Sequence, residues 1–207
     1  MSRLLDISPP ITPALAVWPE DVPFRQDYAL RMDQGAHLDL SSIHTTVHLG
    51  AHADAPSHYG AGAPGIGERD LALYYGPCQV MTVDGVRGRR ILPADLPGPV
   101  QAPRLLLRTG SYPDPTRFNP DFASLSPALV HVLADQGVVL VGIDTPSVDP
   151  FDSKALESHQ AILHRDLAIL EGLVLDAVAP GLYTLIALPL RIPGADASPV
   201  RAVLVDE

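Results

Sequence analysis

Three histidines and one aspartate lie within eleven residues of this chain, at His48, His52, Asp54 and His58. His44 lies four positions upstream, so four of the eight histidines fall in one short segment. Imidazole and carboxylate groups are the side chains that bind zinc, manganese and iron in proteins. The segment therefore predicts a metal-binding site.

The spacing of His48 and His52, four residues apart, is that of metalloprotease helices, but the surrounding residues argue against a helix. The β-branched residues of Thr45–Val47 favour a strand, Gly50 weakens a helix, and Pro56 would end one. We therefore expect a strand that turns at Gly50 and directs the ligands toward one point.

Three ligands would leave one coordination position of the metal open, which is the catalytic rather than the structural arrangement. The single cysteine also argues against a structural zinc site. His58 follows Asp54 by four residues, beyond Pro56. It is either a fourth ligand or a free acid/base, because an imidazole exchanges protons near neutral pH.

A second group of ionisable residues lies in and after the stretch Ala155–Leu170, which we predict to be the longest helix. The group consists of Glu157, His159, His164, Asp166 and Glu171. Their spacing along the chain does not indicate which of them belong to the site. Glu171 stands out because apolar residues flank it on both sides, and a carboxylate buried among them needs a cation. Asp144, at the end of a predicted buried strand, is a weaker candidate.

The rest of the chain predicts a single compact, β-rich α/β domain over residues 1–207, with more strands than helices. Five prolines between Pro9 and Pro23 predict an irregular segment that wraps over a surface or a pocket. Trp18, in this segment, is either a core anchor or a surface on which an aromatic substrate stacks. A short helix is expected at 72–75 and another at 126–135, and strands at 28–32, 37–47, 78–83, 104–109, 138–144, 183–190 and 201–205.

Composition narrows the classes of function. The formal net charge of −10 disfavours nucleic acid as a partner, since an acidic surface repels phosphates. No apolar run reaches the roughly 18 residues that a membrane span needs, and the N-terminal residues lack the pattern of a signal peptide. The single cysteine, Cys78, lies in a predicted apolar strand and suits a reducing cytoplasm. We expect a cytoplasmic protein in which Cys78 is buried rather than nucleophilic.

The chain resembles the metal-dependent cyclase-like hydrolases, and within them the bacterial kynurenine formamidases, also called arylformamidases. The signature of the superfamily is matched by the segment from His48 to His58. The narrower resemblance rests on motifs along the whole chain, namely Trp18-Pro19, Tyr75-Gly-Pro-Cys78, Leu107-Arg-Thr-Gly110, Gly142-Ile-Asp144-Thr-Pro-Ser147 and His159-x11-Glu171. The resemblance implies a swivelling β/β/α fold that assembles as a homodimer.

The resemblance also implies two divalent metal ions, most simply Zn²⁺ with Mn²⁺ as an alternative. It implies a role for seven positions of this chain. His48, His52 and Asp54 would bind the first metal and His159 the second, and Asp54 and Glu171 would be shared between the two. His58 would carry protons, and Trp18 would line the substrate pocket. The roles of His44, His164 and Asp144 stay open.

The implied reaction is the hydrolysis of N-formyl-L-kynurenine, a small aromatic formamide, to L-kynurenine and formate. A divalent metal acidifies a coordinated water to supply hydroxide and polarises the formyl oxygen. A general acid must protonate the leaving nitrogen, because an anilide anion leaves poorly; His58 is the candidate. The alternatives are a related hydrolase, such as an isatin hydrolase, and a metal- or ligand-binding protein without turnover.

Overall fold

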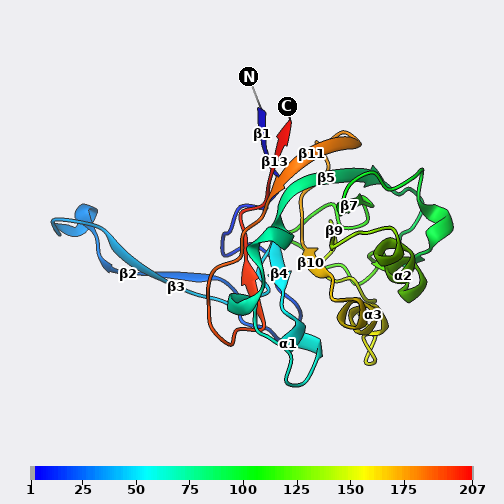
Figure 1. The fold of residues 1–207 in the computed structure, drawn as a ribbon. Helices are drawn as coiled ribbons and strands as arrows, with labels where there is room; N and C mark the ends of the chain where they lie inside the picture. Colours follow the sequence, from blue (N-terminus) through cyan, green and yellow to red (C-terminus); the bar gives the residue numbers. More distant parts are fainter. Residues whose placement is uncertain (1–2, 207) are drawn as a thin grey trace.

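Nine strands form one mixed sheet in the computed structural model, which describes residues 3–206 (Figure 1). In spatial order the strands are β1 (Arg3–Asp6), β13 (Val203–Asp206), β11 (Gly181–Ile186), β5 (Tyr75–Thr82), β7 (Arg104–Arg108), β9 (Leu140–Ile143), β10 (Ala168–Glu171), β4 (His52–Asp54) and β12 (Ala197–Pro199). The four central strands, from β5 to β10, run parallel, and their neighbours on both sides are antiparallel.

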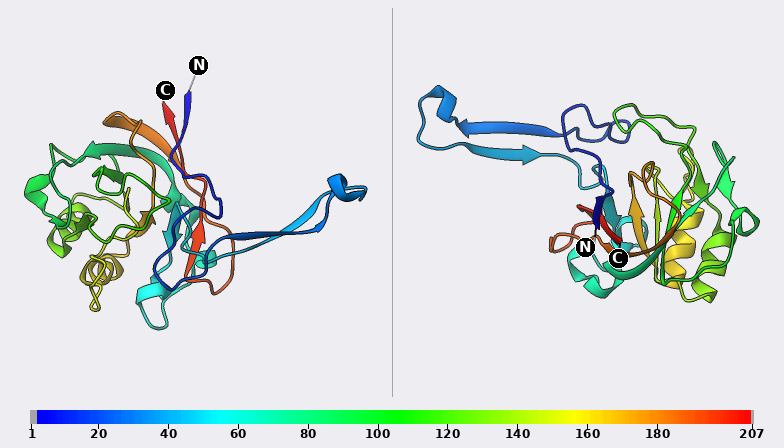
Figure 2. Two further views of the ribbon diagram at one scale, coloured as in Figure 1. Left: turned by 180° about the vertical axis from the view of Figure 1, so that it is seen from behind. Right: turned by 90° about the horizontal axis from the view of Figure 1, so that it is seen from above.

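The central residues of β7, β9 and β10 are apolar because both faces of these parallel strands are covered. Leu105 and Leu107 of β7 point into one buried cluster, whereas Leu106 between them points into another. Helices α2 (Pro127–Asp135) and α3 (Glu157–Arg165) lie side by side on the first of these faces (Figure 2). The predicted β-rich α/β fold is confirmed.

Strands β2 (Arg25–Leu30) and β3 (Leu40–His44) form a hairpin that extends away from the sheet as an arm (Figures 1 and 2). Its tip is the 3-10 turn η1 (Met32–Gln34). Every residue of the two strands is exposed. The predicted strand 37–47 is therefore shorter than expected, because the chain leaves the arm at His44 and bends toward the candidate site.

The prediction of one helix over Ala155–Leu170 is wrong. Helix α3 ends at Arg165, Asp166 adopts a left-handed conformation with φ 51°, and the chain continues as strand β10. The apolar run after Asp166 pairs in parallel with β9 and is buried on both faces, so tertiary pairing overrides the helical pattern. Glu171 consequently ends a strand rather than a helix.

The other predicted elements exist with shifted ends. Ser126 caps α2 as expected, its hydroxyl accepting from the Leu129 amide at 3.1 Å. The predicted short helix at 72–75 is the 3-10 helix η3 (Leu71–Tyr74). The remaining short elements are α1 (Pro56–Tyr59), η2 (Ile66–Glu68), η4 (Pro93–Asp95), β6 (Arg90–Ile91) and β8 (Ser124–Leu125). Within residues 3–206, no helix is long and apolar enough to cross a membrane.

Candidate metal centre

Strand pairing brings three of the predicted ligands to one face of the sheet. His52 and Asp54 are two residues apart on β4, so their side chains point the same way. Glu171, at the end of β10, pairs directly opposite His52 in the antiparallel ladder. Residues opposite each other in such a ladder share a face. The short strand β4, which follows the expected turn at Gly50, therefore positions the centre of the site.

Gly50 makes the turn that the sequence predicts between His48 and His52. Its φ is 57°, in the left-handed region that favours glycine. Its carbonyl oxygen lies 2.9 Å from Nδ1 of His52, which donates to it and leaves Nε2 directed at the carboxylates. Gly172, with φ 66°, packs against this turn, and a Cβ there would lie 2.1 Å from the Gly50 oxygen.

The buried part of the cluster joins two histidines with two carboxylates. Nε2 of His52 lies 3.4 Å from Oδ1 of Asp54 and 3.4 Å from Oε2 of Glu171. Nε2 of His159, on α3, lies 3.4 Å from Oδ2 of Asp54 and 3.7 Å from Oε1 of Glu171. All four side chains are nearly inaccessible to solvent. The donors thus converge on one enclosed point from β4, β10 and α3.

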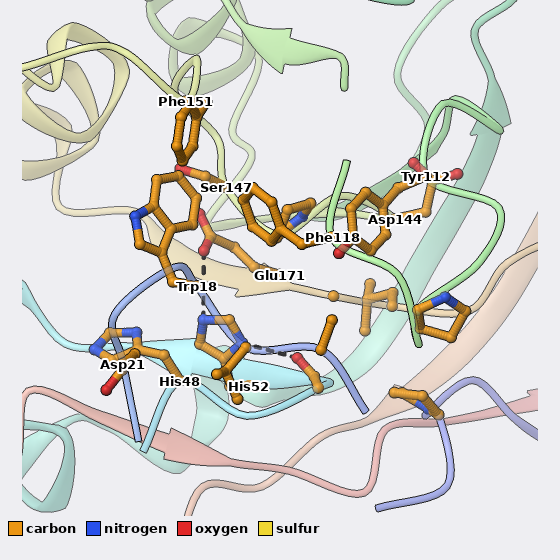
Figure 3. Close-up of a pocket in the computed structure, with 18 of the residues that line it drawn as sticks. Trp18, Asp21, His48, His52, Tyr112, Phe118, Asp144, Ser147, Phe151 and Glu171 are labelled. Atoms are coloured by element: carbon orange, nitrogen blue, oxygen red, sulfur yellow. Dashed lines mark hydrogen bonds and ion pairs between the residues drawn. The ribbon is translucent and has the colours of Figure 1, made fainter. Parts of the chain in front are cut away.

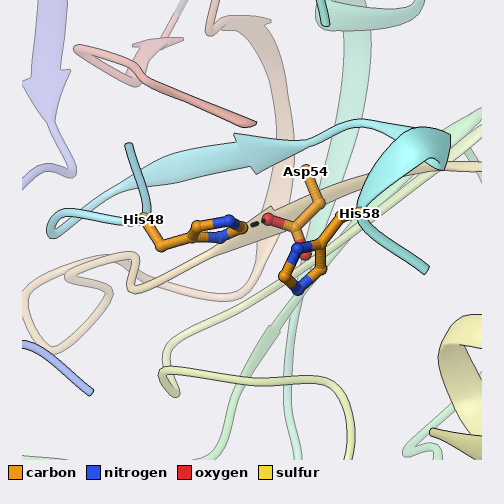
Figure 4. Close-up of side chains that lie close together, drawn as sticks. All are labelled: His48, Asp54 and His58. Atoms are coloured by element: carbon orange, nitrogen blue, oxygen red, sulfur yellow. Dashed lines mark ion pairs between the residues drawn. The ribbon is translucent and has the colours of Figure 1, made fainter. Parts of the chain in front are cut away.

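His48 and His58 extend the cluster toward solvent. Nδ1 of His48 lies 3.0 Å from Oδ1 of Asp54. His58, carried by α1, offers a ring nitrogen within 4.8 Å of donors from both His48 and Asp54 (Figure 4). A second group of the same tightness consists of His52, Asp54 and Glu171. Asp54 belongs to both groups.

The residues fit a divalent cation. Both Asp54 oxygens and Nε2 of His159 are buried without a hydrogen-bond partner. Within residues 3–206, the ion pairs of Asp54 and Glu171 are all with histidines, and no lysine or arginine neutralises the two buried carboxylates. Buried carboxylates need a compensating cation, and imidazole with carboxylate is a donor set for zinc, manganese or iron.

The negative charges of the buried carboxylates also raise the pKa values of the neighbouring histidines when no metal is bound. Burial alone would lower the pKa of His52, but Asp54 and Glu171 outweigh it and raise that pKa to about 10. For His159, burial is likewise outweighed, here by Asp149, Asp54 and Glu171, and its pKa rises to about 10. The carboxylates therefore attract positive charge strongly, and a metal must displace protons to bind.

A cavity of about 550 Å³ opens above the cluster (Figure 3). The proline-rich segment from Pro9 to Asp21 supplies one of its walls, as the sequence predicts. Trp18 is half-buried in this wall, with its ring 5.4 Å from that of Phe118 and 5.1 Å from that of Phe151. Figure 3 shows these rings on one side of the pocket and His48 and His52 on the other. Trp18 thus faces a cavity rather than anchoring the core.

The other sequence candidates lie apart from the cluster. His44 is exposed on the arm, and His164 is exposed on α3. Asp144 lines the cavity, but its carboxylate accepts hydrogen bonds from Thr109 and Gly110 and so fastens their loop. Glu157 and Asp166 pair with arginines. Cys78 is buried as expected, and burial raises its pKa to about 12, which suits no nucleophile.

Two carboxylates near the site were missed by sequence reasoning. Asp196, just before β12, lies 3.1 Å from Nε2 of His48 and 3.4 Å from Nδ1 of His58. Asp149 lies 2.8 Å from Nδ1 of His159. Neither residue belongs to a chemically suggestive run, and only the fold brings Asp196 to histidines about 140 positions away.

Comparison with known proteins defines the class. Residues 5–150 match the family described as "Putative cyclase". A potential metal-dependent hydrolase with cyclase activity superposes with a TM-score of 0.85 at 26% identity, covering 100% of this chain and 99% of that one. A predicted metal-dependent hydrolase from Bacillus stearothermophilus superposes with a TM-score of 0.84 at 25% identity, with 100% of each chain covered. The chain belongs to the cyclase family of metal-dependent hydrolases.

Within that family, the predicted resemblance to kynurenine formamidases is confirmed. The kynurenine formamidase of Bordetella petrii is 46% identical over 206 residues, which cover 99% of this chain and 98% of that protein. Isatin hydrolase A from Labrenzia aggregata shares the fold, with a TM-score of 0.79 over 99% of this chain and 93% of its own, but only 20% identity.

Proposed function

We propose that this protein hydrolyses N-formyl-L-kynurenine to L-kynurenine and formate. The observation that carries the proposal is a buried histidine–carboxylate cluster at the side of a cavity walled by aromatic rings. The cluster suits hydrolysis of an amide, and the rings suit an aromatic substrate. The 46% identity to a kynurenine formamidase over nearly the whole chain favours this substrate over isatin.

The proposal includes two divalent metal ions, with zinc as the first choice and manganese as the alternative. We assign the first to His48, His52 and Asp54 and the second to His159, with Asp54 and Glu171 shared. Asp54 belongs to both groups of closely spaced donor atoms, which supports its assignment as a shared ligand. When bound, such metals acidify water and polarise a carbonyl oxygen.

His58 is the proposed proton carrier. It is the most accessible of the cluster's histidines, with 34% of its side chain exposed, and it lines the cavity. From there it can remove a proton during attack on the formyl carbon and deliver one to the departing aromatic nitrogen. Asp196, 3.4 Å from Nδ1 of His58, is placed to orient the ring.

Trp18 is proposed to stack on the aromatic ring of the substrate. Replacing Trp18 by alanine is expected to raise KM about tenfold, since aromatic pairs contribute about 0.5–1.5 kcal/mol beyond the apolar area that they bury. The thermal unfolding midpoint should change little, because Trp18 is only half-buried. Steady-state kinetics together with a thermal melt measures both. Loss of the cooperative melt with unchanged KM would make Trp18 structural.

The substrate and metal can be tested together. The protein is stripped with a chelator, and Zn²⁺ or Mn²⁺ is restored singly before assay on N-formyl-L-kynurenine and on isatin. We expect no turnover without metal and recovery on the formamide with at least one metal. Turnover of isatin alone would identify a different hydrolase of the family. Metal binding without turnover of either compound would support a binding protein.

A homodimer completes the proposal, and the arm of β2 and β3 supports it. Large apolar side chains on the arm are exposed, including Met32 at 59% and Ile43 at 66%. A two-stranded hairpin is only marginally stable alone, and residues 25–44 match the 20–30 residues that each partner gives to a standard interface. Sedimentation equilibrium should give twice the chain mass of 22.0 kDa; a monomeric mass at micromolar concentration contradicts the dimer.

A further inference from the structure

We propose that Asp149 is a positioning residue that holds the ring of His159 with Nε2 directed into the metal centre, and that Arg90 holds Asp149 in turn. The inference deepens the proposed function, because it concerns a ligand of the proposed second metal. It rests on a set of hydrogen bonds behind His159, on the side away from the cavity.

Asp149 contacts His159 at two points. Oδ2 of Asp149 lies 2.8 Å from Nδ1 of the ring and accepts from the His159 backbone amide at 3.0 Å. The Ser158 amide donates to the same carboxylate at 3.0 and 3.1 Å. Because a carboxylate accepts, the proton of the neutral imidazole lies on Nδ1, and Nε2 is left with a free lone pair.

That lone pair points where a metal is needed. Nε2 of His159 is buried without a hydrogen-bond partner, 3.4 Å from Oδ2 of Asp54. Asp149 itself is not suited to be a ligand, since its two oxygens already accept from four donor groups. Asp54, by contrast, has both oxygens free of hydrogen bonds. The two carboxylates on either side of His159 thus have different roles.

Arg90 compensates the charge of Asp149, which is completely buried. Nη1 of Arg90 lies 2.7 Å from Oδ1 of Asp149. The same nitrogen donates to the Ser158 hydroxyl at 2.7 Å and to the Leu125 carbonyl at 2.8 Å. The arginine therefore ties β6 and β8 to the first turn of α3. Such anchoring restrains both the carboxylate and the helix that carries His159.

Loss of the orienting carboxylate should weaken metal binding. Removing an outer partner of a metal ligand typically lowers metal affinity 10–100-fold. In the full-length protein we expect Asp149→Ala to lower the affinity for Zn²⁺ at one of the two sites by this factor, measured by competition with a chromophoric chelator. Asp149→Asn, which keeps an accepting oxygen, should restore part of the affinity.

A matched control separates positioning from structure. Glu157→Ala removes the other acidic partner of Arg90, which lies 2.6 Å from Nη2, is half-exposed and has no contact with the His159 ring. It should leave the Zn²⁺ affinity unchanged. If folded Asp149→Ala binds Zn²⁺ as the unaltered protein does, and differs only in its thermal midpoint, then Asp149 is merely structural and the proposal is overturned.

A measurement on the unaltered protein decides the matter even if the variants fail to fold. Nitrogen-15 NMR of the zinc-loaded protein should show the His159 proton on Nδ1 and none on Nε2. A proton on Nε2 with zinc bound would overturn the inference. Neither readout uses turnover, so failure to hydrolyse N-formyl-L-kynurenine would refute the proposed function while leaving the positioning role to be decided by these data.

Discussion

Replacing His58 by alanine should leave the metal content unchanged and lower kcat by about 10²–10⁴-fold, the usual contribution of a general acid–base group. The leaving group is an aromatic amine, which departs poorly unless it is protonated as the bond breaks. Among the histidines of the cluster, His52 and His159 are buried and directed at carboxylates. His48 and His58 both line the cavity at the edge of the cluster, but His58 is the more exposed, with 34% of its side chain accessible against 18% for His48.

The measurement must separate a proton carrier from a metal ligand, because His58 also lies within ligand distance of the group formed with His48 and Asp54. Metal is quantified by mass spectrometry on the same samples that are used for kinetics. His164→Ala, which removes an exposed histidine of α3, serves as the control and should change neither value. A parallel loss of metal and activity in His58→Ala would reassign His58 as a ligand.

The local segment of the site was readable from the sequence because its chemistry is contiguous. His48, His52 and Asp54 lie close along the chain, and the glycine between the histidines marks the turn that the structure contains. Glu171 could also be predicted from the sequence, since apolar neighbours on both sides indicate a buried carboxylate. In the structure only 3% of the residue is exposed. These inferences need only local patterns and the cost of burying charge.

The distant part of the site was not readable in the same way. His159 and His164 are equivalent by spacing on a helix, and family resemblance, not residue pattern, favoured His159. The structure shows the physical difference, since His159 faces the sheet and His164 faces solvent. For a related reason, the sequence did not indicate where α3 ends and β10 begins. The apolar run after Asp166 is compatible with either a helix or a buried strand. Asp149 and Asp196 act only through tertiary contacts.

Replacing Asp54 by asparagine should have the largest effect on metal, with loss of both ions and of at least 10³-fold in activity. Oδ1 of Asp54 faces His48 and His52, and Oδ2 faces His159, so the side chain serves every part of the cluster. Asparagine keeps the shape but removes the negative charge and presents an amide group, which donates where a metal requires an acceptor. Glu171→Gln should have a smaller effect, because Oε1 of Glu171 is also engaged by the Val148 amide at 2.7 Å.

Two measurements test the role of Asp54. Metal content after dialysis should be near zero for Asp54→Asn, and Asp166→Asn is the matched control, since Asp166 is exposed and pairs with Arg69 rather than with the cluster. Thermal melts provide the second readout, because a ligand that binds only the folded state stabilises it by about 4.1 kcal/mol at 1,000 times its Kd. Added Zn²⁺ should therefore raise the midpoint of the unaltered protein and of Asp166→Asn but not that of Asp54→Asn. Full metal occupancy in Asp54→Asn would mean that Asp54 is a ligand of neither metal, and the proposed division of ligands between two metals would fail with it.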